Sequence, residues 1–231
     1  MHAVGIVAAA GSGLRLGAEL PKALVPLGGR PLVCWAVESL RDGGVTDVVV
    51  TVPADQRAAF TAVLPADVRV VDGGPTRTAS VRAGLAAAGH GADVVLVHDA
   101  ARPLTPPDVV ARVLAALAAG AAAVVPVLPV VDTVVVVDAA GTVTGAVPRA
   151  DLRRVQTPQG FDRVALTAAY AALDQAAELT DDAAVVRALG VPVVTVAGDE
   201  GAAKVTVAHA LALAELQLRR RAASSAEEVE R

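Results

Sequence analysis

Continuous apolar runs alternate with segments of helical periodicity along most of the chain. The runs are short, rich in valine and bounded by turn residues, a pattern typical of strands that are buried on both faces. Helical segments separate them, the first beginning at Pro31, because proline suits a first helical position. This alternation predicts an α/β fold, in which a mostly parallel sheet carries helices on both faces. The expected strands cover residues 3–10, 46–53, 68–74, 93–99 and 121–130, and the later expected helices cover 55–64, 77–89 and 108–120.

The alternation is interrupted between about residues 130 and 156. Short β-rich pieces surround a turn at Ala140-Gly141, and no helical pattern separates them. We interpret this stretch as a β-arm that protrudes from the main sheet. Its exposed edges need cover, and a second copy of the same arm would supply that cover, so we expect a homodimer.

Beyond the arm the α/β pattern resumes. We expect a helix at about 162–177, a second helix with its N-terminus at Thr180, a strand at 191–197 and a last helix from Thr206. Residues 222–231 form a polar tail that we expect to fray. The sequence therefore predicts one domain over residues 1–221, followed by that tail.

The composition supports one sizeable hydrophobic core. The chain has 231 residues, of which 54% are hydrophobic and 19% are charged, a balance typical of folded domains. Its formal net charge of −4 argues against nucleic acid or an anionic membrane as a partner. No apolar stretch has the length of a membrane span. We expect a soluble, cytoplasmic protein, with its one cysteine, Cys34, buried in the core.

A glycine-rich loop follows the first expected strand, in the segment AAAGSGLRLGAELPK. Gly11, Gly13 and Gly17 give G-x-G-x-x-x-G, which differs from the dinucleotide-binding spacing, and the G-K-[ST] of a Walker loop is absent. The loop still suits phosphate, because glycines leave backbone N–H groups open to an anion and Arg15 and Lys22 add two cations. The alternative is a surface turn whose charges are solvated.

Asp99 ends the fourth expected strand, in the segment VLVHDAARP. The carboxyl ends of strands are where open α/β sheets bind ligands, and a carboxylate facing a triphosphate is a good Mg²⁺ ligand. The alternative makes Asp99 a helix cap near Arg102. Strand alternation points the neighbouring His98 to the other side, so we expect that histidine to be packed and hydrogen-bonded rather than catalytic.

Several motifs together carry a family resemblance. They are AAAGSGLRLGAELPKAL, GGPTRTASVRAGL, VHDAARP, DT at 132–133, PR at 148–149, VQTPQGF, LTDDAA and KVT at 204–206, in this order. With them the chain resembles the 2-C-methyl-D-erythritol 4-phosphate cytidylyltransferase family from about Val4 to Glu215. The loop is common to many nucleotidyltransferases, whereas HDAARP with TPQ and TDDA is much narrower. The resemblance implies a Rossmann-like nucleotidyltransferase domain with a protruding β-arm.

The resemblance also implies a reaction and its residues. CMP would pass from CTP to the phosphate of methylerythritol phosphate, pyrophosphate would leave, and Mg²⁺ would be the cofactor. The implied catalytic residues are Arg15, Lys22 and Lys204, and the implied metal ligand is Asp99. The implied nucleotide-binding residues are Ala8, Ala9, Ala10, Gly11, Ser12, Gly13, Gly74, Ser80 and Asp99. The implied acceptor-binding residues are Arg102, Thr133, Arg149, Thr157 and Lys204, with Thr133 and Arg149 reaching the neighbouring subunit's site through exchanged arms.

The implied chemistry agrees with the residues present. A phosphate monoester is largely ionised at neutral pH, so the acceptor needs no general base, and the sequence offers no convincing one. The task is to bring two anions together, which calls for cations and a metal around an in-line transfer.

The chain departs from the family pattern in two places. In GDEGAAKVTVAHAL, Ala202, Ala208 and Ala210 stand where the family usually has other residues, although Lys204 is retained. Pro75 replaces a residue that is often polar and near the base. Two alternatives therefore stay open: a cytidylyltransferase for ribitol 5-phosphate or another polyol phosphate, and a catalytically weak nucleotide-binding regulatory protein.

Overall fold

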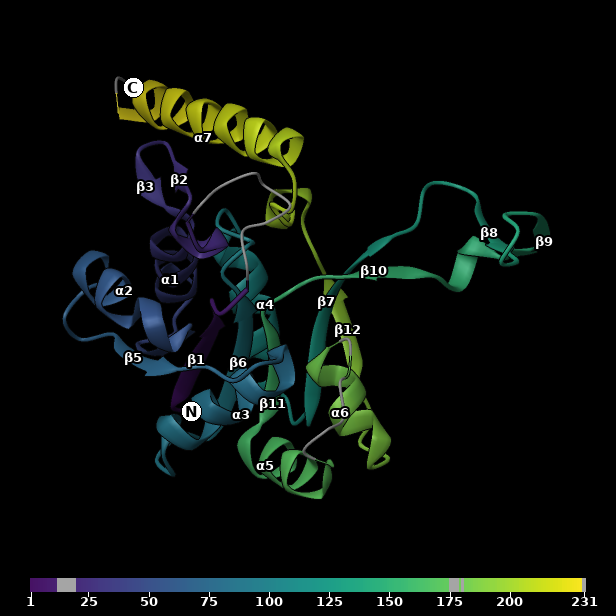
Figure 1. Ribbon diagram of the computed structural model, residues 1–231, viewed down its shortest axis with the longest axis horizontal. Coiled ribbons are helices and arrows are strands. Elements are labelled where there is room, and N and C mark those ends of the chain that lie inside the picture. Colours follow the sequence, from purple (N-terminus) through teal and green to yellow (C-terminus); the bar gives the residue numbers. More distant parts are fainter. Residues whose placement is uncertain (12–19, 175–178, 180, 230–231) are drawn as a thin grey trace.

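A central β-sheet carries the chain's longest apolar runs in the computed structural model, which describes residues 1–11, 20–174, 179 and 181–229. Within these residues eight strands form the sheet: β1 (Ala3–Ala8), β4 (Asp47–Val52), β5 (Arg69–Asp72), β6 (Val94–Asp99), β7 (Ala123–Pro129), β10 (Arg153–Val155), β11 (Gln159–Asp162) and β12 (Val194–Ala197). Their order is β10-β7-β11-β6-β1-β4-β5, and β12 pairs with β7 outside this path (Figure 1).

The sheet is mixed, and its longest parallel run, β6-β1-β4-β5, extends to one edge. Strand β1 pairs in parallel with both β4 and β6, β4 pairs in parallel with β5, and β12 with β7. Strand β11 runs antiparallel to its two neighbours β6 and β7, and β10 runs antiparallel to β7. The expected parallel core is confirmed, and the antiparallel strands are a finding. They follow from the arm, because a chain that returns without a helical crossover pairs in the opposite direction.

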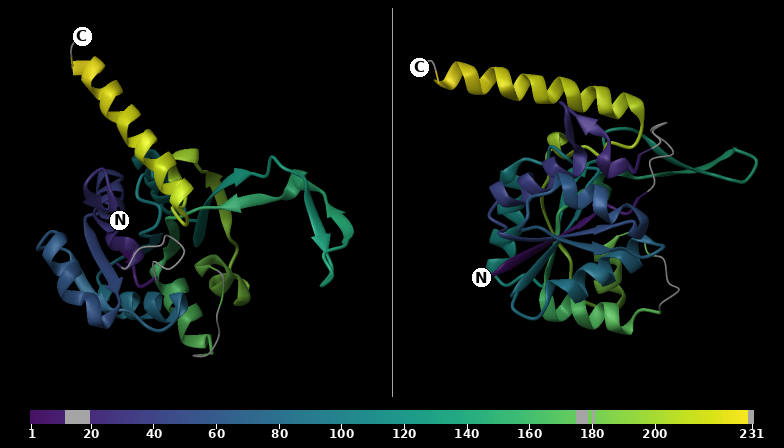
Figure 2. Two further views of the ribbon diagram at one scale, coloured as in Figure 1. Left: turned by 45° about the horizontal axis from the view of Figure 1, so that its top comes forward. Right: turned by 60° about the vertical axis from the view of Figure 1, so that its left-hand side comes forward.

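Helices cover both faces of this sheet, as expected. They are α1 (Leu32–Asp42), α2 (Arg57–Val63), α3 (Arg77–Ala88), α4 (Pro107–Ala118), α5 (Arg163–Ala172) and α6 (Asp182–Ala188). The last helix, α7 (Ala208–Val229), lies outside these two layers. Alternate strand residues point to opposite faces. Val7 and Leu96 therefore pack with residues of α1, α2 and α4, while Ile6 and Val95 pack with residues of α3, α5 and α6. Figure 2 shows the sheet between these two helical layers.

Some helix boundaries differ from the sequence-based expectation. Pro31 precedes α1 in an extended conformation, with ψ 143°, rather than starting the helix. Helix α5 ends at Ala172, because the next residue is extended, and residues 175–178 of the expected helix lie outside the described part. Helix α7 starts at Ala208 and continues to Val229, past residue 221, because the alanine- and glutamate-rich tail favours helix. The domain limits at 221 and 222 stay a prediction.

The β-arm is present. Strands β8 (Val134–Val137) and β9 (Val143–Val147) form an antiparallel hairpin that projects away from the sheet (Figures 1 and 2). Its turn is closed by Asp138, whose carboxylate accepts hydrogen bonds from the backbone N–H groups of Ala140 and Thr142. Three successive valines, Val135, Val136 and Val137, are exposed on the hairpin. The arm thus presents apolar side chains outside the core of its own subunit.

A second, smaller hairpin was not foreseen. Strands β2 (Pro26–Leu27) and β3 (Arg30–Pro31) follow the short 3-10 helix η2 (Lys22–Leu24). Helix α7 lies across this hairpin, where Glu215 Oε1 accepts the Gly28 N–H at 2.9 Å (Figure 2). Gly28 has φ +57°, and a Cβ there would overlap the Leu218 side chain. The C-terminal helix thereby fixes the segment that follows Lys22.

Candidate functional site

The site lies where the strand order reverses. Strands β4 and β5 succeed β1 on one side, whereas β6 lies on the other, and Ala8 at the end of β1 pairs with Asp99 at the end of β6. The carboxyl ends of two adjacent strands diverge at such a point, because their following loops turn to opposite faces of the sheet. The topology alone therefore places a crevice beside Ala8 and Asp99.

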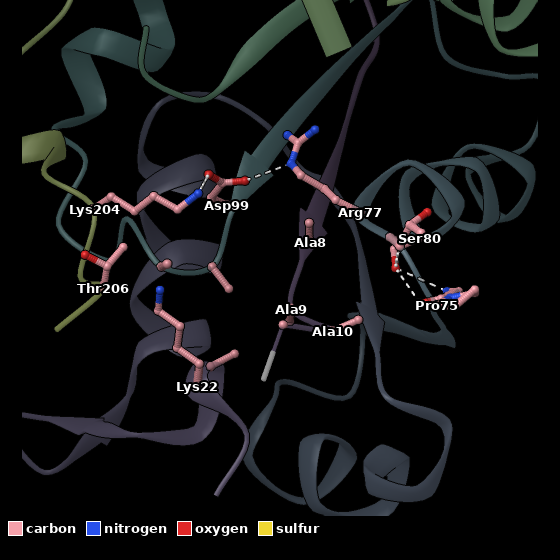
Figure 3. A pocket seen from close by; sticks show the side chains of 16 residues that line it. Ala8, Ala9, Ala10, Lys22, Pro75, Arg77, Ser80, Asp99, Lys204 and Thr206 are labelled. Atoms are coloured by element: carbon pink, nitrogen blue, oxygen red, sulfur yellow. Dashed lines mark hydrogen bonds and ion pairs between the residues drawn. The ribbon is translucent and has the colours of Figure 1, made fainter. Parts of the chain in front are cut away.

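A pocket of about 440 Å³ occupies this crevice (Figure 3). Its charged lining residues are Lys22, Arg77, Lys204 and Asp99, so three cations surround one carboxylate. The rest of its wall is built mainly from small side chains and exposed backbone. The complete lining comprises Ala8, Ala9, Ala10, Gly11, Lys22, Ala23, Gly74, Pro75, Thr76, Arg77, Ser80, Asp99, Ala100, Ala101, Lys204 and Thr206. This surplus of positive charge suits an anionic ligand.

Asp99 is the electrostatic centre of the pocket. Lys204 Nζ lies 2.7 Å from its Oδ2, and Arg77 Nε lies 3.3 Å from its Oδ1. Arg102 Nε is 4.0 Å from Oδ2. Burial alone would raise the pKa of this carboxyl, but Arg77 and Lys204 outweigh it and hold the pKa well below its usual range. Asp99 is therefore ionised wherever the protein is folded at neutral pH.

Arg77 joins the pocket to a second buried carboxylate. Its Nη2 lies 2.7 Å from Asp182 Oδ2, and Asp182 is fully buried at the start of α6. Tyr170 Oη donates a hydrogen bond of 2.5 Å to Asp182 Oδ1. Burial by itself would lower the pKa of Arg77, yet Asp182 and Asp99 raise it, so the guanidinium stays charged. Asp99, Arg77 and Asp182 form a continuous ion network.

Behind Asp99, a second network is neutral. The Thr157 hydroxyl accepts the Asp99 N–H at 3.0 Å and lies 2.9 Å from His98 Nδ1. His98 Nε2 faces the Arg102 carbonyl, which can only accept, so Nε2 carries the proton and Nδ1 accepts from Thr157. Burial lowers the pKa of His98 to about 4. The expectation of a packed, hydrogen-bonded histidine is confirmed.

Lys204 reaches the pocket from an anchored segment. The preceding 3-10 helix, η5 (Glu200–Ala202), is held by Arg102, whose Nη1 donates to the Ala202 carbonyl at 2.7 Å. On the other side, the Val205 N–H donates to the Ala101 carbonyl at 2.7 Å. These bonds use backbone acceptors and donors, so they do not depend on which side chain stands at 202. The family departure at this position leaves Lys204 in the pocket.

Lys22 enters the pocket from η2, on the same side as Lys204 in Figure 3. It begins η2, whose other residues, Ala23 and Leu24, are buried and so fix the backbone below it. Lys22 and Lys204 are the only two lysines in the sequence. The 18 remaining basic residues, from a total of 20, are arginines. Both ε-ammonium groups of the chain thus lie at one site.

The implied site residues fall into four groups. Those lining the pocket are Ala8, Ala9, Ala10, Gly11, Lys22, Gly74, Ser80, Asp99 and Lys204. Arg102 and Thr157 contact Asp99 from behind without lining the pocket, and Thr133 and Arg149 lie exposed on the arm, away from it. Ser12, Gly13 and Arg15 lie outside the described residues.

Sequence reasoning missed Arg77 and Thr206, both of which line the pocket. For Arg77 a signal was present. It is the first residue of α3, after the cap Thr76, where the positive end of the helix dipole disfavours a cation. An arginine at that position implies acidic partners elsewhere in the fold. Gly84 allows α3 to lie close to β1, since any larger residue would place a Cβ 2.5 Å from Ile6 Cγ2. This close packing sets Arg77 beside β6.

The residues present fit a divalent cation that is shared with a nucleotide. Asp99 is ionised and lines the pocket. In the described part of the chain, no group of three or more His, Cys, Asp or Glu residues could hold a metal by itself. Mg²⁺ suits such a site, because it is usually bound by one or two carboxylates together with phosphate oxygens and water.

No helix in the described part of the chain is long and apolar enough to cross a membrane.

Comparisons with known proteins agree on one family. The family model for 2-C-methyl-D-erythritol 4-phosphate cytidylyltransferase matches residues 3–220. A relative with that name from Nocardia farcinica is 57% identical over 223 residues, which cover 95% of each chain. The solved structure of the Thermus thermophilus protein of that name is 40% identical, with a TM-score of 0.77, and the match covers 95% of this chain and 100% of that one. A 4-diphosphocytidyl-2C-methyl-D-erythritol synthase from Anaerococcus prevotii is 25% identical, with a TM-score of 0.81, over 94% of this chain and 98% of its own.

Proposed function

This chain belongs to the 2-C-methyl-D-erythritol 4-phosphate cytidylyltransferase family and is a nucleotidyltransferase of isoprenoid precursor biosynthesis, and we propose that it uses CTP and Mg²⁺ as a homodimer. The product would be 4-diphosphocytidyl-2-C-methyl-D-erythritol, with pyrophosphate released. One observation carries the proposal: both lysines of the chain and the ionised Asp99 converge on a pocket at the strand-order reversal.

The proposed step is an in-line displacement. A phosphate oxygen of the acceptor attacks the α-phosphorus of CTP, a new P–O bond forms, and the bond to the leaving pyrophosphate breaks. The acceptor phosphate is already ionised, so no side chain has to remove a proton. Lys22 and Lys204 would hold the negative charge that gathers on the α-phosphate between them. Arg15, which lies outside the described residues, would add a third cation.

Asp99 would hold the metal. When bound, Mg²⁺ would neutralise phosphate charge and orient the departing pyrophosphate. Asp99 Oδ2 now contacts Lys204, so Lys204 would pass from the carboxylate to the phosphate as the nucleotide arrives. The Lys204 ammonium group would be paired with an anion before and after this movement, so the movement costs little free energy.

The cytidine would lie against the small-residue wall. The Ala8, Ala9 and Ala10 backbone and Gly74 leave space and polar backbone atoms for a pyrimidine. Ser80 fixes Gly74 by accepting its N–H at 3.1 Å, and the Ser80 hydroxyl donates to the Thr76 carbonyl at 2.9 Å. A purine would overlap this wall, so we expect CTP to be preferred to ATP and GTP.

The acceptor would be bound by two subunits. Arg102, Thr157 and Lys204 gather around Asp99 in one subunit. Thr133 and Arg149 lie on the projecting arm and would reach the acceptor of a second copy. The exposed valines of the arm support this exchange, because contact with a partner would bury them. A cytoplasmic location stays a prediction of the sequence.

Pyrophosphate release tests the reaction directly. We expect rapid release with CTP and 2-C-methyl-D-erythritol 4-phosphate, little with ribitol 5-phosphate, and none without an acceptor. CTP should outperform ATP and GTP under identical conditions. Faster release with ribitol 5-phosphate, or preference for a purine nucleotide, would contradict the proposal. Absence of release with every acceptor, despite nucleotide binding, would favour the regulatory alternative.

A further inference from the structure

The Arg77 guanidinium lies between two carboxylates that differ in their surroundings. On the pocket side, its Nε is 3.3 Å from Asp99 Oδ1. On the core side, its Nη2 is 2.7 Å from Asp182 Oδ2, and Asp182 is completely buried whereas Asp99 faces the pocket. The shorter contact is therefore the one away from the pocket. Arg77 thus forms a close ion pair with the buried Asp182 and a longer hydrogen bond with Asp99.

Asp182 is itself rigidly placed. Tyr170 Oη donates to its Oδ1 at 2.5 Å, and the residue opens α6. That helix start is braced by Gln159, whose Oε1 accepts the Ala183 N–H at 3.0 Å, and by Asp181, whose Oδ1 accepts the Ala184 N–H at 2.8 Å. The negative charge also lies at the positive end of a helix, which stabilises it there. The anchor of Arg77 is thus fixed before any ligand binds.

We propose that Asp182 is a positioning residue, which tethers Arg77 and thereby keeps one face of Asp99 open to a divalent cation. This inference rests on the proposed metal role of Asp99. A guanidinium and a metal ion compete for the same carboxylate oxygens. The proposed movement of Lys204 to the phosphate would free Oδ2 for the metal, which leaves Arg77 as the cation that competes at Asp99. The present single contact, from Arg77 Nε to Asp99 Oδ1, leaves the other carboxylate oxygen to the metal. An Arg77 released from Asp182 could instead form a bidentate pair with Asp99 and occupy both oxygens.

If Asp182 tethers Arg77, removing its charge should weaken metal binding. Asp182→Asn keeps the size of the side chain and removes its charge, so Arg77 loses its stronger partner. Arg77 should then turn to Asp99 and weaken metal binding, by roughly ten- to a hundredfold for the gain of one charge-assisted hydrogen bond. Removing the competitor as well, in Arg77→Gln/Asp182→Asn, should restore metal binding to at least the wild-type value. This double variant also leaves no unpaired buried charge.

The experiment measures metal binding without turnover. Free Mn²⁺, standing in for Mg²⁺, is followed by electron paramagnetic resonance in the presence of CTP and without an acceptor, and thermal unfolding is recorded in parallel. Tyr170→Phe is the matched control, because it removes the hydrogen bond from Tyr170 to Asp182 and leaves the ion pair with Arg77. We expect Tyr170→Phe to lower stability while leaving Mn²⁺ affinity within about twofold of wild type.

Each outcome supports or overturns the proposal that Asp182 tethers Arg77. Weaker Mn²⁺ binding in Asp182→Asn, restored in the double variant, supports the tether. A lower unfolding temperature with unchanged Mn²⁺ affinity overturns it, and so does a double variant that binds as poorly as the single one. If Asp182→Asn fails to fold, the double variant alone decides, since weaker binding than wild type would refute the competition. Asp99→Asn separates the two proposals: unchanged affinity there removes the metal role and the tether together, whereas weakening there but not in Asp182→Asn removes only the tether.

Discussion

The position of Lys22 is fixed by apolar neighbours in η2. Ala23 and Leu24 are buried below it, and the backbone of η2 closes on itself through the Val25 N–H, which donates to the Lys22 carbonyl at 3.2 Å. The ammonium group can therefore meet a phosphate without reorganising the chain. Preorganised charge of this kind is the usual source of rate enhancement in phosphoryl transfer.

Lys22→Ala should lower kcat by roughly 10²–10³, the typical loss when one preorganised donor is removed. The fold should survive, because the anchoring contacts belong to the next two residues. Steady-state pyrophosphate release gives kcat, and circular dichroism checks the fold. Lys22→Arg serves as the matched variant, since it keeps the charge and should lose less. Near-normal turnover in Lys22→Ala would remove this lysine from the mechanism.

Single residues of the site were predictable to different degrees. Asp99 could be identified from sequence, because a carboxylate at a strand end has a local signal. Its partner Lys204 is 105 positions away, and no periodicity connects the two, so only the family resemblance linked them. The roles of Arg102 and Thr157 needed the structure, which places both behind Asp99. The tethering of Arg77 by Asp182 depends on three elements meeting, which no local pattern reveals.

At the scale of elements, His2 connects the amino ends of neighbouring strands. Its backbone N–H donates to Asp93 Oδ2 at 2.7 Å, its Nε2 lies 2.6 Å from Asp47 Oδ2, and its Nδ1 lies 2.9 Å from the Gly91 carbonyl. A carbonyl and a carboxylate both accept, so the imidazole satisfies both only when both nitrogens are protonated. The hydrogen bond to Gly91 and that to Asp47 raise the pKa of His2.

Stability should therefore depend on pH through His2. Because the pKa is higher in the folded protein, the contribution is complete below the unfolded value of about 6.5 and is lost as pH rises through the folded value. His2→Gln should lower Tm more at about pH 5.5 than at about pH 8.5. Thermal unfolding of both proteins at the two pH values measures this. His209→Gln, on the exposed face of α7, is the control. An equal decrease at both pH values would show that the imidazole charge is irrelevant.

Elements with their own periodicity were predicted, and those defined by their partners were not. The β-arm was recognised because a missing helix is itself a local signal. The hairpin of β2 and β3 has two residues in each strand, too few for any alternation. Strand β11 has only the four residues Gln-Gly-Phe-Asp, too few for a clear alternation. Its antiparallel insertion between β6 and β7 follows from the path of the arm. Helix α7 passes residue 221 because the alanines and glutamates there have high helix propensity.

At the scale of the whole molecule, the arm separates two halves of the implied site. Lys22 lines the pocket, whereas Arg149 lies on the arm and donates to the Val131 carbonyl there. A single subunit therefore does not bring Arg149 to its own pocket. A homodimer with exchanged arms would assemble complete sites from both chains.

Mixed dimers test this exchange. Lys22→Ala and Arg149→Ala should each be nearly inactive as homodimers. In a mixed dimer, one site collects both defects and the other has neither, so random mixing should make about a quarter of all sites complete. Refolding the two variants together and assaying pyrophosphate release measures the recovery, with mixed dimers verified by mass. If each arm served its own subunit, every site would keep one defect and activity would not return.

The restriction of lysine to the pocket has a consequence for amine chemistry. Every ε-amine of the chain belongs to Lys22 or Lys204, and the amino terminus lies apart from them beside Asp93. Immobilising the protein through its lysines would attach it by the nucleotide site and block that site. Reductive methylation with ¹³C-formaldehyde, in contrast, would label both lysines of the pocket and give a resonance for each. Those resonances would report nucleotide occupancy by NMR without any engineered label.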